Sequence, residues 1–297
     1  MTRRKHVKGD LAFSYTYLAP FLVIFTLFTL LPVLVSVFFS FTYYNVLEPP
    51  KWVFLQNYLK LFLNDDIFLI SFKNTLIIAL ITGPVGYAMS LVFAWLINEL
   101  NDTLRAIFVL IFYAPSISGG VYTIWGIIFS GDSFGYANSL LLYLGVIKEP
   151  IQWLTDKQYM LWLVIIVMIW MSLGAGFLSF VAGLRTIDRS YFEVGYIEGI
   201  RNRWQELWYI TLPCLRPQMM FGAVMSITSA FTCGAITTAL CGNPSTDYGA
   251  HTILNHLTDY GTTRFDMGYA CAIATVLFFI MIFVNEVVQR AITKIGN

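Results

Sequence analysis

Residues 11–47 read LAFSYTYLAPFLVIFTLFTLLPVLVSVFFSFTYYNVL, and no Asp, Glu, Lys, Arg or His interrupts them. A helix needs about 20 predominantly apolar residues to cross the hydrocarbon core of a bilayer. Lipid offers no hydrogen-bond partners, so every backbone N–H and C=O in such a segment must be paired internally. The stretch therefore predicts a transmembrane helix, which we place at residues 15–41.

Five further charge-free stretches follow, each close to that length or longer. They cover residues 74–98, 106–131, 158–184, 217–246 and 267–285. A shorter one, 133–147, is expected to be interfacial or re-entrant. The whole chain is 58% hydrophobic and only 12% charged, whereas soluble domains carry about 25% charged residues. We predict an all-α integral membrane protein with six transmembrane helices, at residues 15–41, 74–98, 106–130, 158–184, 218–240 and 267–287.

The distribution of basic residues predicts the orientation of the chain. With a cytoplasmic N-terminus, two thirds of the 18 Lys and Arg residues fall in segments on the cytoplasmic side, which is the direction of the positive-inside rule. Both termini are therefore expected in the cytoplasm. The predicted layout is a cytoplasmic tail at 1–14, an extracytoplasmic segment at 42–73, a core domain at 74–290 with a cytoplasmic loop at 185–217, and a cytoplasmic tail at 291–297.

Three classes of membrane protein fit this pattern: a subunit of an ATP-driven transporter, an ion-coupled transporter and a membrane-embedded enzyme. Ion-coupled carriers usually hold an ionisable group at membrane depth, and an intramembrane enzyme needs paired carboxylates or a histidine cluster there. The six stretches contain no Asp, Glu, Lys, Arg or His, and so offer neither kind of site. The chain also has no G-x-x-x-x-G-K-[ST] phosphate loop. The energy source is therefore expected to be another protein.

Other sites are disfavoured by composition. A net charge of +1 argues against nucleic-acid binding, which requires a basic surface. The four cysteines show no C-x-x-C spacing and are interpreted as small buried hydrophobes. His251 and His256 lie in an outer loop at the wrong spacing for one helical face, so we expect a solvated pair and no metal site.

The cytoplasmic segment between the fourth and fifth stretches combines charge with aromatic residues. It holds five arginines and four acidic residues, yet also Tyr, Trp and Phe side chains worth roughly 1.5–3 kcal/mol each when buried. A helix is expected at about 190–198, with Phe192, Tyr196 and Gly199 on one face. Gly199 would break it, and residues 204–210 could form a second helix. Two interpretations stay open: this face packs on the chain's own helix ends, or it docks into a partner's groove.

Three short motifs in this segment resemble a known signature. Glu193-Val194-Gly195, Glu198-Gly199 and Ile210-Thr211-Leu212-Pro213 resemble the EAA signature of ABC importer permeases. Val194 and Gly195 replace the two alanines of the family pattern, and Glu198 replaces an Asp. The resemblance continues at Gln56-Asn57-Tyr58, Asn74-Thr75, Trp153-Leu154-Thr155-Asp156, Trp170, Ala182-Gly183-Leu184, Ile187, Arg216-Pro217 and Gly268-Tyr269-Ala270. With these residues the chain is similar to the carbohydrate-uptake branch of the family, which includes maltose and multiple-sugar permeases.

The resemblance implies a type I ABC importer permease in the bacterial plasma membrane that is itself not an enzyme. It implies as partners a second homologous permease subunit, two cytoplasmic ATPase subunits that bind ATP and Mg, and an extracytoplasmic solute-binding protein that delivers a carbohydrate, an oligosaccharide in our interpretation. No cofactor is expected in this chain. Glu193 is expected to pair with a basic residue of the ATPase, and Gly199 to set the turn; the implied coupling residues are Phe192, Glu193, Tyr196, Glu198 and Gly199.

The resemblance also implies a sugar site halfway through the membrane. The corresponding positions that offer hydroxyls or aromatic rings here are Tyr113, Ser116, Ser172, Ser229 and Thr232. Several polar positions of the family are apolar in this chain, namely Met168, Met171 and Met225. Either the substrate contacts differ or the partner subunit holds the site. For each hydroxyl, a hydrogen bond between helices is an equally good interpretation.

The charge asymmetry gives a topological prediction. A cysteine introduced near Asn202 should react with an impermeant thiol reagent only from the cytoplasm, and one near Asp259 only from outside. Labelling of both positions from the same side would contradict the six-helix topology.

Overall fold

The structure, a computed structural model, describes residues 17–294. The predicted tail 1–14 lies outside the described residues, as do the last three residues of the tail 291–297. The chain forms two compact units, which we describe separately. The first comprises the described residues up to Asn64 together with Leu257–Val276, and the second comprises Asp65–His256 together with the described residues from Leu277 onward.

The first unit begins with the predicted first span, a helix over Tyr17–Phe39. Its middle, η1 (Thr26–Leu30), is π-helical, and α2 (Leu31–Phe39) completes it. Its side chains are almost all exposed, as expected for a helix that faces lipid. The rest of the unit consists of β1 (Thr42–Tyr43), β2 (Lys51–Trp52), α3 (Gln56–Leu63), the last residues of α15, η4 (Asp259–Thr263) and the beginning of α16 (Met267–Thr293).

A two-stranded sheet in this unit corrects the all-α prediction. β1 and β2 pair antiparallel, with Thr42 opposite Trp52. The connection contains Pro49 and Pro50, which have no N–H to donate and cannot continue a helix. The first residues of α16 lie directly against this hairpin: a Cβ on Gly268 would meet the Thr42 carbonyl oxygen at 2.1 Å, so only glycine fits there.

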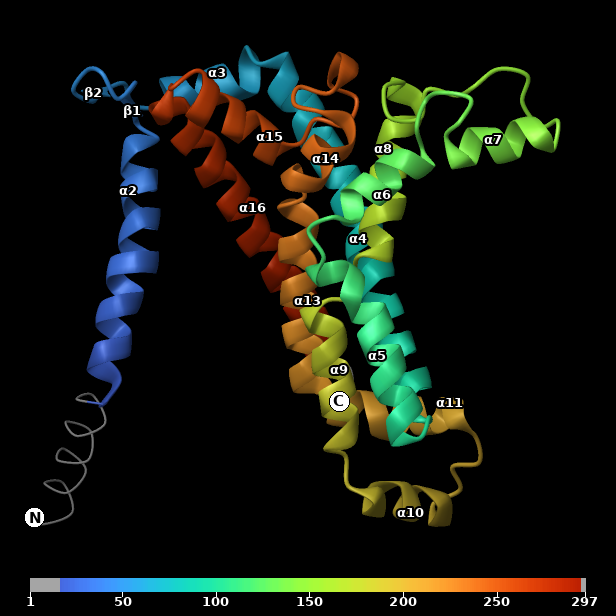
Figure 1. The fold of residues 1–297 in the computed structure, drawn as a ribbon. Helices are drawn as coiled ribbons and strands as arrows, with labels where there is room; N and C mark the ends of the chain where they lie inside the picture. Colours follow the sequence, from blue (N-terminus) through green and yellow to red (C-terminus); the bar gives the residue numbers. More distant parts are fainter. Residues whose placement is uncertain (1–16, 295–297) are drawn as a thin grey trace, which may run out of the picture. The chain divides into compact units, whose positions relative to one another are not determined.

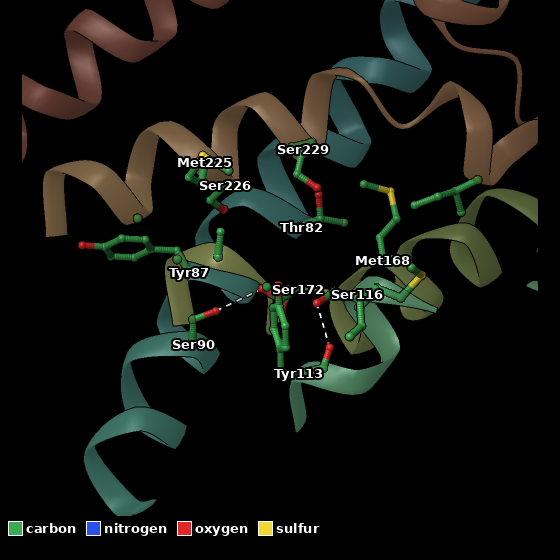
Figure 2. Close-up of a pocket in the computed structure, with 18 of the residues that line it drawn as sticks. Thr82, Tyr87, Ser90, Tyr113, Ser116, Met168, Ser172, Met225, Ser226 and Ser229 are labelled. Atoms are coloured by element: carbon green, nitrogen blue, oxygen red, sulfur yellow. Dashed lines mark hydrogen bonds between the residues drawn. The ribbon is translucent and has the colours of Figure 1, made fainter. Parts of the chain in front are cut away.

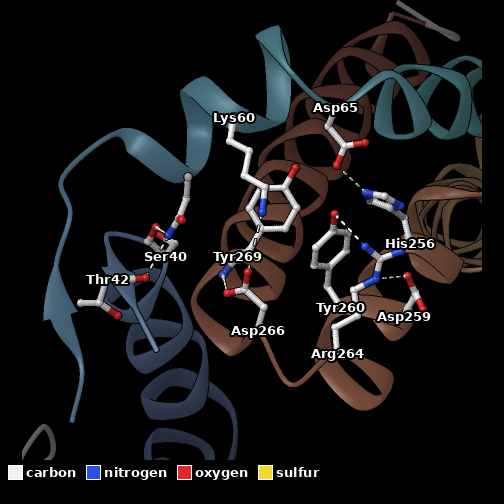
Figure 3. Close-up of polar contacts among 11 residues, drawn as sticks. Ser40, Thr42, Lys60, Asp65, His256, Asp259, Tyr260, Arg264, Asp266 and Tyr269 are labelled. Carbon is white, nitrogen blue, oxygen red and sulfur yellow. Dashed lines mark hydrogen bonds and ion pairs between the residues drawn. The ribbon is translucent and has the colours of Figure 1, made fainter. Parts of the chain in front are cut away.

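In the first unit, two cationic side chains lie over aromatic rings (Figure 3). Lys60 Nζ lies 4.0 Å from the centroid of the Tyr269 ring and 3.8 Å from Asp266 Oδ2. The Arg264 guanidinium lies 4.4 Å from the Tyr260 ring. Such contacts add about 0.5–2 kcal/mol each, and those of Lys60 join α3 to the beginning of α16.

All regular elements in the described part of the second unit are helices, joined by loops (Figure 1). Its elements are α4 (Asp66–Asn98), α5 (Asp102–Ile117), α6 (Val121–Ile128), α7 (Tyr136–Tyr143), α8 (Lys157–Trp170), α9 (Ala175–Arg185), α10 (Arg189–Ile197), α11 (Arg203–Glu206), η2 (Leu207–Thr211), α12 (Leu212–Cys214), α13 (Arg216–Phe231), α14 (Gly234–Cys241), η3 (Thr246–Tyr248), α15 (Ile253–Thr258) up to His256, and the remainder of α16.

Among the described residues, four helices are long and apolar enough to cross a membrane, and two bent pairs raise the number to as many as six. The four are Tyr17–Phe39, Asp66–Asn98, Lys157–Arg185 and Met267–Thr293. The predicted span at 106–130 is not one straight helix, because α5 and α6 meet at 84°. Pro115 interrupts the hydrogen bonding of α5, and Gly119 and Gly120 follow. The pair α13 and α14, at the predicted span 218–240, bends by 41°.

The core of the second unit lies where α4, α9 and α13 pack together. Phe177, Phe180 and Leu215 are fully buried there. Two small residues let α9 and α13 approach closely: a Cβ on Gly176 would lie 3.3 Å from the Gly222 Cα. Small residues at helix crossings are how membrane helices gain van der Waals contact, since lipid removes the hydrophobic driving force between them.

The prediction that His251 and His256 form a solvated pair is wrong. Their side chains are 3% and 1% exposed, and His256 Nε2 lies 3.0 Å from Asp65 Oδ2 (Figure 3). The other oxygen of Asp65 caps α4 by accepting from the Phe68 N–H. The loop before α15, which holds His251, is bound to α4 by Asn74, whose amide donates to the carbonyls of residues 248, 249 and 251. Within residues 17–294 no group of three or more His, Cys, Asp or Glu could hold a metal ion.

Candidate functional site

A cavity of about 410 Å³ lies inside the second unit, between α4, α5, α13 and the junction of α8 and α9 (Figure 2). Four of the five predicted pathway residues line it: Tyr113, Ser116, Ser172 and Ser229. Thr232 does not, and its hydroxyl donates to the Thr228 carbonyl. The other lining residues include Thr82, Tyr87, Ser90, Tyr122, Met168, Met171, Ala175, Phe180, Met225 and Ser226. No ionisable Asp, Glu, Lys, Arg or His is among the described lining residues.

The junction of α8 and α9 shapes this cavity. The helix stops at Trp170, and Gly174 is extended with ψ −140° before α9 begins. The carbonyl of Ser172 accepts the Gly174 N–H at 2.8 Å and the Ser90 hydroxyl on α4 at 3.2 Å. A Cβ on Gly86 would lie 2.7 Å from the Ser172 Cβ. Glycine at position 86 therefore lets the broken segment rest directly on α4 and brings Ser172 to the cavity.

Most hydroxyls around the cavity already donate to backbone carbonyls. Ser116 donates to Tyr113, Ser226 donates across the helices to Gly83, and Thr82 donates within its own helix to Ile78. Of the predicted residues, Ser116 and Thr232 donate within their own helices, whereas Ser90 and Ser226, which were not predicted, make hydrogen bonds to other segments. Ser172 differs, because its buried Oγ has no hydrogen-bond partner in the described part of the chain. The cavity thus presents hydroxyl oxygens as acceptors, whereas the Ser172 hydroxyl is shielded beside Gly86 on α4.

Thr82, Ser90, Tyr122 and Ser226 are lining residues that sequence reasoning missed. Two signals point toward them. Gly83-Pro84 and Gly86 in the second span indicate a close approach on one side of that helix. Ser226 and Ser229 are three residues apart and so share a helical face.

The segment predicted to be cytoplasmic, residues 185–217, forms the second candidate site. α10 begins at Asp188, whose carboxylate accepts a hydrogen bond from the Ser190 N–H; this bond lowers the pKa of Asp188. The helix ends after Ile197, and Gly199 adopts φ +97°, in the left-handed region where glycine is favoured. The chain turns sharply there, and α11 and η2 lead it back toward α13.

Each face of α10 has a distinct environment. Gly195 is buried, because a Cβ there would lie 2.7 Å from the Ile210 side chain. Phe192 is half-buried, and the Tyr196 hydroxyl donates to Glu206 at 2.7 Å, an interaction that raises the pKa of Tyr196.

The opposite face of α10 is open. Tyr191, Val194 and Ile197 are 58%, 53% and 86% exposed, and Glu193 and Glu198 are exposed beside them. Of the predicted face of Phe192, Tyr196 and Gly199, only Phe192 is half-buried; Tyr196 is 59% exposed, although its hydroxyl is bound to Glu206, and Gly199 is exposed. A different apolar set, with two carboxylates, points away from the chain itself. Both interpretations left open by the sequence thus find a face on this helix.

Comparison with known proteins places these features in context. Residues 75–294 match the model of the family described as "Binding-protein-dependent transport system inner membrane component". The chain is similar to the probable ABC transporter permease protein YesP of Bacillus subtilis (33% identical, covering 95% of this chain and 90% of the relative). It is also similar to the lactose transport system permease protein LacF of Rhizobium radiobacter (31% identical, 72% and 70%).

Among solved structures, the fold is similar to a chain of a bacterial ABC transporter involved in the import of the acidic polysaccharide alginate. The TM-score is 0.75 at 24% identity, and the match covers 99% of this chain and 100% of that one. The family match covers most of the second unit and includes both the cavity and the cytoplasmic helix. The chain belongs to the binding-protein-dependent transport system inner membrane components, the membrane-spanning permeases of ABC transporters.

Proposed function

We propose that the chain is one of two permease subunits of an importer for oligosaccharides, driven by partner ATPase subunits through α10. Its relatives support the carbohydrate class: they include permeases for lactose, arabinooligosaccharides and sulfoquinovosyl glycerol. One similar solved structure holds an alginate ABC transporter in complex with an alginate pentasaccharide-bound periplasmic protein. An extracytoplasmic binding protein would deliver the sugar to this chain in the same way.

The observation that carries the proposal is the uncharged, hydroxyl-lined cavity at the break between α8 and α9. Sugar hydroxyls donate and accept hydrogen bonds, and the hydroxyl oxygens of the cavity lining can accept them. The Tyr113 and Tyr122 rings and the methionines supply apolar surface for the faces of the sugar ring. A carrier that coupled transport to an ion would need a charged group at this depth, and the described lining has none.

In this proposal α10 is the coupling helix. Its open face of Tyr191, Val194 and Ile197 would enter a groove of the ATPase subunit, and Glu193 would pair with a basic residue there. ATP and Mg²⁺ are bound by the ATPase subunits. Closure of those subunits would move α10 and, through the core formed by α4, α9 and α13, change access to the cavity. Phe192, Glu198 and Gly199 hold or aim the helix.

The coupling assignment predicts a specific loss. Glu193→Lys places like charges together, and breaking one buried charge pair at an interface costs about 2–5 kcal/mol. Gly199→Val is strained at φ +97°. Both variants should insert into the membrane. Less ATPase subunit should co-purify with them, and sugar uptake should fall at least about tenfold, because each 1.4 kcal/mol of lost binding free energy lowers the binding constant tenfold. Glu149→Lys, an exposed glutamate in an outer loop, is the matched control. Full uptake and full ATPase recovery in both variants would show that the segment is internal packing.

The cavity assignment predicts a loss of sugar uptake without a loss of ATPase subunit on co-purification. Ser229→Trp fills the cavity from α13 with a large side chain, so sugar uptake should fall steeply while ATPase recovery stays at the wild-type level. Phe221→Trp, an exposed position on the same helix, should leave both unchanged. Uptake that survives Ser229→Trp would remove this cavity from the pathway.

A further inference from the structure

Glu206 is an acidic side chain that the proposed function does not use, and it is buried. It ends α11, at the point where the cytoplasmic segment returns toward the spans. Only 5% of the residue is exposed, although it lies among charged and polar neighbours at the cytoplasmic end of the second unit. A buried carboxylate must have its oxygens hydrogen-bonded or paired, because its desolvation is otherwise costly.

Both carboxylate oxygens of Glu206 have partners. Oε1 accepts the Tyr196 hydroxyl at 2.7 Å, and Oε2 lies 3.1 Å from Arg203 Nη1. Tyr196 belongs to α10, whereas Arg203 and Glu206 belong to α11. The hydrogen bond therefore crosses the turn at Gly199 and joins the two cytoplasmic helices. A hydrogen bond to an ionised acceptor is shorter and stronger than one between neutral groups.

The same cluster is attached to the helix that lines the cavity. Arg203 Nε lies 3.6 Å from Oε1 of Glu99, which caps the C-terminus of α4. This ion pair is largely exposed and contributes little by itself. Beside it, the rings of Trp95 on α4 and Trp204 on α11 pack with centroids 5.4 Å apart. α10 is thus connected to α11 through Glu206, and α11 is connected to α4 through Arg203 and Trp204.

We propose that Glu206 is a positioning residue that, through the Tyr196 hydroxyl, holds α10 at the angle that presents Tyr191, Val194 and Ile197 to the ATPase subunit. This rests on the proposed function for the identity of the partner. The orientation of α10 itself is a property of this chain. Two contacts fix it: Gly195 lies on Ile210, and Tyr196 is bound to Glu206. The first allows α10 to rotate about the contact point, and the second stops that rotation.

The first measurement needs no partner. A nitroxide on Val194→Cys, in the purified full chain with the exposed Cys214 replaced by Ser, reports the mobility of α10 by EPR. Tyr196→Phe and Glu206→Leu should each raise that mobility, and the double variant should raise it no further, because each change breaks the same bond. Glu206→Gln keeps an acceptor oxygen and should restore part of the order. Tyr209→Phe, which removes an exposed hydroxyl from the neighbouring η2, is the control.

The second measurement uses the assembled transporter and compares sugar uptake with ATP hydrolysis. Tyr196→Phe and Glu206→Leu should lower uptake per ATP hydrolysed by several-fold, and Tyr209→Phe should not. Tyr196→Phe removes only the hydroxyl oxygen, so this variant still tests the proposal if Glu206→Leu folds poorly. Unchanged label mobility in Tyr196→Phe would overturn the proposal. Increased label mobility with unchanged sugar uptake per ATP would confirm that the bond between Tyr196 and Glu206 holds α10. It would instead contradict the docking role assigned to α10 under the proposed function.

Discussion

The absence of hydrogen-bond partners in lipid is the constraint on which the second unit depends. Wherever a spanning helix is interrupted, the freed backbone groups must find partners inside the protein. At the interruption between α8 and α9, the Ser172 carbonyl accepts hydrogen bonds from the Gly174 N–H and from the Ser90 hydroxyl on α4. The Ser226 hydroxyl on α13 donates to the Gly83 carbonyl on α4, which adds a hydrogen bond between these two helices. Ser90, Ser172 and Ser226 all line the same cavity, so its polar surface lies where these segments are joined.

The parts of the fold that follow from local pattern could be predicted from the sequence. Charge-free stretches located the apolar helices, and the glycine at position 199 marked the break after α10. Tyr113, Ser116, Ser172 and Ser229 were expected near a common pathway and do line one cavity. The bend between α5 and α6 was missed because hydropathy is blind to direction: residues 106–130 are apolar on both sides of the bend at Gly119 and Gly120.

Contacts between distant residues could not be predicted. Asp65 and His256 are 191 positions apart, and nothing in the sequence near His256 indicates that its ring will be buried beside the Asp65 carboxylate. The same holds for Ser90 and Ser226, whose partners are backbone carbonyls on other helices. In α10, the 3.6-residue period correctly placed an apolar face but could not tell which of two apolar faces the chain would cover. Burial of Gly195 against Ile210 decides this, and it leaves Tyr191, Val194 and Ile197 exposed.

Under the proposed function, the cavity would receive the sugar, α10 would bind an ATPase subunit, and ATP hydrolysis by other subunits would drive transport. This division of roles is tested most directly by reconstitution in liposomes. The purified chain alone, given an imposed proton or sodium gradient, should accumulate no sugar and hydrolyse no ATP. Addition of its partner permease, ATPase subunits and loaded binding protein should start ATP-dependent accumulation. Ion-driven accumulation by the chain alone would contradict the account and establish a self-sufficient carrier.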